Sequence, residues 1–207
     1  MRTGCRVSRV VLNVGPALSD NGIVTPLGLD VGEALARSML RAVAAYTNDA
    51  GRLDYGALRR SIEFSNAQGH ARRLAHVAVD EGHPREARFA FWINVYNALA
   101  LHGAVALDVR RSVWRVWNFF GRVSYRVGPH VLSLDEIEHG ILRGNRRRAL
   151  PPWAPFGTWD ARRALVIDPV DPRIHFAINC GAASCPPVGI YHAGAIDAQL
   201  RVATRIS

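Results

Sequence analysis

Apolar residues recur at helical spacing along much of the chain. Asp30 is placed to cap a helix whose apolar positions lie three and four residues apart over 31–47, and similar spacing predicts further helices over 56–63, 67–79 and 193–202. The stretch 86–105 is the clearest, because its large apolar and aromatic residues define a helix that faces the core. The spacing of the apolar residues therefore predicts a helix-rich chain.

A turn and a helix start follow this stretch. Gly128-Pro129 separates two extended pieces, 123–127 and 130–132, which predicts a hairpin. Ser133 is followed three positions later by Glu136, the pattern of a capping box. It predicts a helix that ends near Arg143, with Gly144 as the residue beyond its end.

Two later segments favour strands, at 164–167 and, by alternation of apolar and polar positions, at 174–179. Residues 1–29 show weak periodicity and two prolines, and we interpret them as an irregular N-terminal segment. Residues 30–207 are expected to form the domain. The predicted fold class is α+β, a single helix-rich domain with a small β-sheet.

Composition agrees with one globular domain. The 207 residues are 49% hydrophobic and 21% charged, which suffices for a real core. The net charge is +9, and all 26 basic residues are arginine. A codon bias toward GC-rich triplets is the plain explanation that we favour, and a patch for phosphate, carboxylate or nucleic acid is the alternative. Interleaved aromatics or a known module are lacking, so we expect no nucleic-acid partner.

The cysteines and the hydropathy bear on the compartment. The three cysteines, Cys5, Cys180 and Cys185, do not make a disulfide framework. No apolar run reaches the length of a transmembrane span, and the first 17 residues do not resemble a secretory signal. We expect a cytoplasmic protein. The sequence identifies neither a cofactor nor a partner.

The most unusual segment lies between His175 and Pro187. Cys180 and Cys185 sit five apart in a loop that follows the last predicted strand, a common position for catalytic groups. Three chemistries fit these thiols: a nucleophile activated by a histidine, a metal site that also uses histidines, and a redox pair. A buried cysteine that only packs is the plain alternative for Cys180.

Two other positions combine polar groups with apolar surroundings. Glu138 falls within the apolar arc of the helix after Ser133, and His139 borders the same face. The carboxylate is either a structural ion-pair partner, with an arginine for example, or a group that orients a histidine or transfers protons. Asn94 and Asn97 share one face of the core helix, where they either hold neighbouring backbone or face a reaction centre.

Three blocks of the sequence resemble the family known as domain of unknown function 547. They are residues 91–99 (FWINVYNAL), the IEHGILR block over 137–143, and the block over 171–187 that ends in SCPP. The resemblance covers residues 53–200 and assigns no roles to the polar positions that it matches, which are Asn94, Asn97, Glu138, His139, Arg173, His175, Cys180 and Cys185. Relatives generally continue beyond the last block, so we expect the final part of the domain to be missing here.

Our leading hypothesis is a thiol-dependent hydrolase or acyl transferase. Cys185 is the expected nucleophile, His139 or His175 the base, and Glu138 the residue that orients the base. Cys180 belongs to the same candidate site, and Asn94, Asn97 and Arg173 are candidate binding residues. The alternatives are a non-catalytic interaction module and a Cys/His metal-binding domain.

Overall fold

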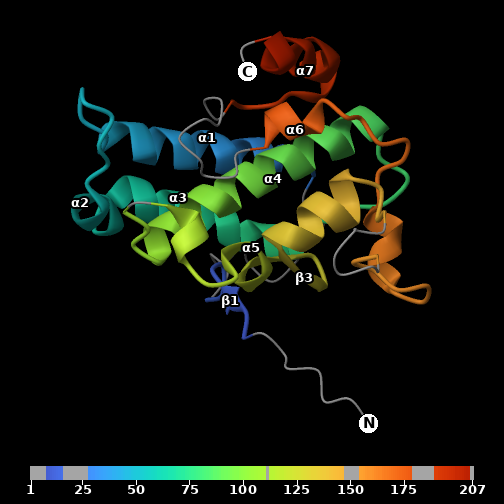
Figure 1. Cartoon of the computed structure of the whole chain (residues 1–207), viewed down its shortest axis with the longest axis horizontal. Helices are drawn as coiled ribbons and strands as arrows, with labels where there is room; N and C mark the ends of the chain where they lie inside the picture. Colours follow the sequence, from blue (N-terminus) through green and yellow to red (C-terminus); the bar gives the residue numbers. More distant parts are fainter. Residues whose placement is uncertain (1–7, 16–27, 111, 147–153, 179–188, 206–207) are drawn as a thin grey trace.

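Helix α4 (Arg85–Ala106) runs through the middle of the molecule (Figure 1). A computed structural model describes residues 8–15, 28–110, 112–146, 154–178 and 189–205. Phe89, Trp92 and Tyr96 are among the largest fully buried side chains, and most other α4 residues are buried as well. A helix that is apolar on nearly all sides is stable only when other elements cover it.

Helix α1 (Asp30–Ala45) supplies part of that cover, because it packs on α4 and also on helix α3 (Ile62–Arg73), whose Phe64 contacts His102 of α4. The short helix α2 (Tyr55–Arg59) precedes α3, and a 3-10 turn, η1 (Leu74–His76), follows it. Asp54 and Ser61 begin α2 and α3, because each side chain accepts a hydrogen bond from a backbone N–H of the first turn. Asp30 is the first residue of α1 and does not act as its cap.

A small sheet lies beside these helices. Strand β2 (Val123–Val127) pairs antiparallel with β3 (His130–Ser133), and Gly128 at φ +52° forms the turn between them. The predicted hairpin is confirmed. The 3-10 turn η2 (Val113–Arg115) and helix α5 (Phe119–Arg122) lead into β2. The sheet order is β1-β2-β3, in which β1 is the short strand Val10–Val11.

Strand β1 (Val10–Val11) corrects the expectation for residues 1–29. We expected an irregular segment, but these two residues pair in parallel with Val123 and Ser124 of β2. Asn13 is buried, and its side chain bonds the backbone of both Ala71 and Arg126. A two-residue strand is too short to produce a periodic sequence pattern, so β1 can be recognised only from its pairing with β2.

The C-terminal half contains short elements, and two of them differ from expectation. The first half of the predicted strand at 164–167 belongs to a 3-10 helix, η4 (Ala161–Leu165), whose first turn is capped by the Asp160 side chain, and Val166 and Ile167 form no strand. The predicted strand at 174–179 contains helix α6 (Ile174–Ala177), whose preceding turn is closed by a bond from the Ile174 N–H to the Asp171 carbonyl. Short alternating patterns do not distinguish a strand from one helical turn.

The remaining elements complete a single helix-rich α+β domain with a small mixed sheet, as predicted. They are the π-helix η3 (Glu136–Leu142), the 3-10 turn η5 (Ala193–Ala195) and helix α7 (Ile196–Arg205). In the part of the chain that the structure describes, α4 alone has the length and apolar composition to cross a bilayer, and 78% of its apolar window is buried inside the domain. We conclude that α4 is a core helix and that the described residues hold no clear transmembrane segment.

Candidate functional site

The described site residues come from the central helix and from two shorter elements. Glu138 and His139 belong to η3, Asn94 and Asn97 to α4, and His175 to α6. Both thiols of the hypothesis, Cys180 and Cys185, lie outside the described residues. The structure therefore describes the flanks of the thiol segment and not the thiols themselves.

Glu138 is held by two neighbours. Its side chain is 17% exposed, and its Oε1 accepts a hydrogen bond of 2.9 Å from Arg143 Nε. Its Oε2 accepts a bond of 3.2 Å from the Tyr96 hydroxyl of α4. His139 Nε2 lies 3.8 Å from Oε1, which is an ion-pair distance and too long for a hydrogen bond. The structural ion pair with an arginine, one of the two expected readings of Glu138, is present.

A π-helix creates this arrangement. The Arg143 N–H donates to the Glu138 carbonyl five residues back at 2.8 Å, and the Arg143 guanidinium donates to the carboxylate of the same residue. The reciprocal Ser133–Glu136 bonds confirm the predicted capping box, and Gly144 at φ +68° follows the helix as expected. π-helical turns are rare and occur often at functional sites, so η3 marks Glu138 and His139 as residues of interest.

Asn94 and Asn97 hold two points of the chain that flank the thiol segment. The Asn94 amide donates to the Tyr191 carbonyl at 2.8 Å and accepts from the Tyr191 N–H at 2.9 Å. The Asn97 amide donates to the Ala177 carbonyl at 3.0 Å. The two asparagines lie on one face of α4, as predicted. Both therefore hold backbone, the first of the two roles expected for them.

Arg173 and His175 lie at the start of α6. The Arg173 guanidinium binds Asp171 at 2.7 Å and Asp197 of α7 at 2.8 Å, and the Arg173 hydrogen bonds lower the pKa of Asp171. Arg173 thus joins α6 to α7. His175 is exposed, and its ring contacts Phe176 edge to face. Of the two candidate bases, His139 alone has a carboxylate within 4 Å among the described residues.

A metal reading has no support in the described residues, where no group of three or more His, Cys, Asp or Glu side chains could hold an ion. Both thiols lie outside the described residues, so the Cys/His metal hypothesis stays a hypothesis.

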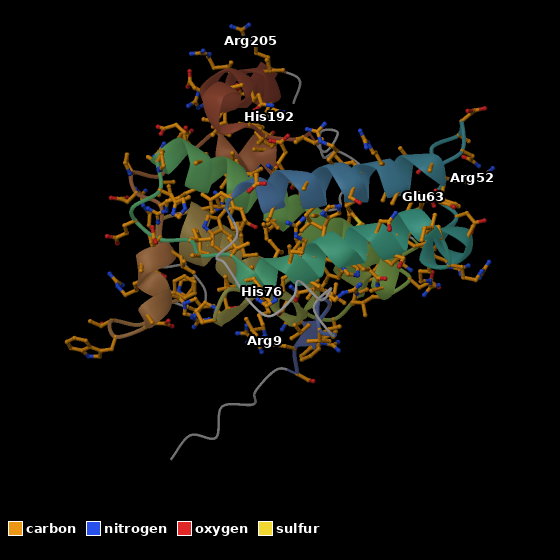
Figure 2. All side chains as sticks on the ribbon, turned by 180° about the vertical axis from the view of Figure 1, so that it is seen from behind. Arg9, Arg52, Glu63, His76, His192 and Arg205 are labelled. Atoms are coloured by element: carbon orange, nitrogen blue, oxygen red, sulfur yellow. The ribbon has the colours of Figure 1, made fainter. Side chains whose placement is uncertain are left out.

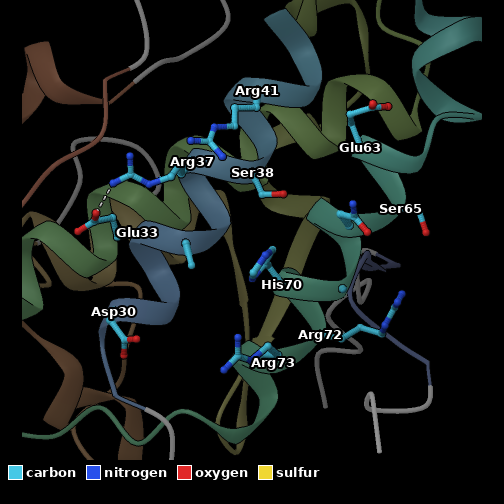
Figure 3. A pocket seen from close by; sticks show the side chains of 13 residues that line it. Asp30, Glu33, Arg37, Ser38, Arg41, Glu63, Ser65, His70, Arg72 and Arg73 are labelled. Carbon is cyan, nitrogen blue, oxygen red and sulfur yellow. Dashed lines mark hydrogen bonds and ion pairs between the residues drawn. The ribbon is translucent and has the colours of Figure 1, made fainter. Parts of the chain in front are cut away.

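A pocket of about 830 Å³ lies between α1 and α3, away from the predicted residues (Figure 3). Four arginines and three acidic residues line it, and His70 stands near its middle. Burial and the charge of Arg73 lower the pKa of His70, and its Nδ1 is buried without a hydrogen-bond partner. Sequence analysis missed this pocket because its lining comes from two helices that pair only in the fold. Because both basic and acidic side chains line the pocket, its charge does not indicate a class of ligand.

The fold and the flanks of the thiol segment define a class: a helix-rich α+β domain whose buried central helix bonds the chain on both sides of a segment that contains two cysteines. The chain belongs to the family of proteins of unknown function called DUF547, whose sequence profile matches residues 81–206. No curated protein and no solved structure matches it.

Proposed function

We propose that this protein is a thiol-dependent enzyme of the hydrolase or acyl-transfer type. Cys185 is the nucleophile, His139 is the base, and Glu138 orients the base. One observation carries the proposal: α4 contacts both flanks of the thiol segment through Asn94 and Asn97, and it contacts Glu138 through Tyr96. A single rigid helix thus links the thiol segment to the Glu138–His139 pair, as a preorganised site requires.

The chemistry proceeds in two steps. The imidazole takes the thiol proton, the sulfur attacks an acyl carbonyl, and the leaving group departs with that proton. Water or another nucleophile then attacks the thioester while the imidazole takes its proton, which returns the thiol. Glu138 stabilises the imidazolium formed in each step, and for this its 3.8 Å separation from His139 has to shorten. Asn94 and Asn97 are positioning residues for the segment.

Labelling with iodoacetamide at pH 7 tests the nucleophile. We expect Cys185 in the folded protein to react at least tenfold faster than in the unfolded protein, because a nearby base raises the thiolate fraction. His139→Gln should remove most of that excess, and His175→Gln, which changes an exposed ring on α6, serves as its matched control. Equal rates at Cys185 in folded and unfolded protein would rule the proposal out.

A second candidate, the non-catalytic interaction module, is favoured by one contact. Glu138 bonds Arg143 at 2.9 Å, closer than it approaches His139. If Glu138 is only a structural residue, Glu138→Gln lowers the melting temperature and leaves the reactivity of Cys185 unchanged. If Glu138 orients a base, the same substitution lowers the labelling rate under conditions where the protein stays folded.

A further inference from the structure

Two tryptophans project from the segment between α4 and the sheet. Trp114 is 68% exposed and Trp117 is 71% exposed, whereas Trp92 is fully buried in the core. Trp114 contacts the half-buried Phe120 with ring centroids 5.2 Å apart. We call Trp114, Trp117, Phe120 and the two arginines beside them (Arg115 and Arg122) the tryptophan surface. Adjacent exposed aromatics of this size usually mark an interaction site.

The core fixes the segment that carries these rings. Val113 of η2 and Phe119 of α5 are buried, so both short elements are anchored. The Arg122 Nε donates to the Ser8 carbonyl at 3.3 Å, and its guanidinium lies 5.9 Å from the Trp117 ring centroid. The tryptophans are therefore presented by an ordered turn, which lowers the entropic cost of using them in binding.

The charge around the rings has one sign. From Ser112 to Leu134 the sequence contains no Asp or Glu. Arg115 is exposed, and among the described residues neither Arg115 nor Arg122 forms an ion pair.

The acidic residues that border this stretch are compensated. Asp108 precedes it and pairs with Arg59 and Arg110. Glu136 follows it and pairs with Arg9 and Arg162. The uncompensated charge of the tryptophan surface is therefore positive.

We propose that the tryptophan surface docks on an anionic lipid membrane. Indole rings favour the boundary between acyl chains and headgroups, and arginines next to them attract anionic phosphates. Such a peripheral contact needs no deep groove, in keeping with a surface turn. Single-stranded nucleic acid would use the rings as stacking platforms, but Phe120 and Arg122 already lie against them.

The surface is separate from the proposed thiol site. Helix α5 lies beside β1 and β3, on the side of the molecule away from α6 and α7 (Figure 1). Figure 2 shows Arg9 of β1 and His192, which follows the thiol segment, at opposite sides. Membrane docking at the tryptophan surface would therefore leave α6 and His192, which flank the thiol segment in sequence, on the side away from the bilayer.

Vesicle sedimentation tests the proposal with the full chain. We expect binding to vesicles of phosphatidylcholine in which about 30% of the lipid is anionic phosphatidylglycerol, a share that gives the membrane a negative surface potential. Binding to vesicles of phosphatidylcholine alone should be weak. Binding to the anionic vesicles should be lost at high salt, which screens the attraction between the arginines and the lipid phosphates. The double substitution Trp114→Ser, Trp117→Ser should reduce the bound fraction at least tenfold. Arg115→Gln with Arg122→Gln should weaken binding to the anionic vesicles only.

Trp159→Ser is the matched control, because Trp159 is 97% exposed and lies outside the tryptophan surface. It should bind as the unchanged protein does. Absence of binding to anionic vesicles at low salt would overturn the proposal, and so would equal binding by the double variant and the control. Fluorescence anisotropy with an oligo-dT strand covers the competing partner: tighter binding to the strand than to vesicles, lost in the double variant, would also overturn it.

Discussion

His102 lies in the core, with its ring Nδ1 2.8 Å from the Tyr125 hydroxyl and its ring edge to face with Phe64. Burial lowers the pKa of His102 to about 4. A histidine that stays neutral in the folded state opposes protonation, whereas the unfolded chain takes up the proton near its ordinary pKa. The unfolded state therefore binds more protons between these two pKa values.

The stability of the protein should accordingly fall as the pH drops from about 6.5 to about 4. The contribution of His102 is about 1.4 kcal/mol per pH unit, the value of one pKa unit. Urea unfolding at pH 7, 5.5 and 4.5 measures it. His102→Gln should flatten this slope although it lowers stability at pH 7. A slope equal to that of the unchanged protein would show that another group carries the effect.

Residue chemistry near Glu138 could be predicted only in part. The apolar arc around Glu138 indicated that the carboxylate is either a structural partner or a site group, and the structure supplies Arg143 and Tyr96 as its partners. Arg143 lies five positions after Glu138, a spacing that meets in a π-helix and not in an α-helix. Projection of the sequence at α-helical spacing therefore could not pair these two residues.

At the scale of elements, η3 packs closely against the chain that follows it. A Cβ added at Gly140 would lie 2.5 Å from the Phe156 ring. Gly140→Ala should therefore destabilise the protein by about 1–3 kcal/mol, the range for overpacking a filled core. Gly157→Ala is the control, since nothing lies within 4 Å of a Cβ added there. Equal midpoints for the two variants in urea unfolding would contradict the packing.

Element prediction succeeded where a pattern was long or its turn chemistry was specific. The core helix at 86–105, the hairpin around Gly128-Pro129 and the capping box at Ser133 all appear in the structure. The two predicted strands at 164–167 and 174–179 failed. Each is about one turn long, and aspartate caps at Asp160 and Asp171 decide the local backbone.

At the scale of the whole molecule, Asn13 joins segments that are far apart in sequence. Its amide donates to the Ala71 and Arg126 carbonyls, and its carbonyl accepts from the Arg126 N–H. Asn13→Ala leaves these buried groups without partners, so we expect a loss of about 2–3 kcal/mol in the free energy of unfolding. Val14→Ala, at the next and 66% exposed position, should change it little. Similar losses in both variants would contradict this role.

The α1–α3 layer also has a consequence for fragments of the chain. Leu35 and Met39 of α1 are fully buried, and they belong to the layer that packs on α4. Both precede the family match, which begins at residue 81. A shortened protein that starts at residue 81 would expose to water the apolar face of α4 that α1 covers. Such a fragment should aggregate on expression. The cooperative folding unit therefore extends to residues before the region that the family profile matches.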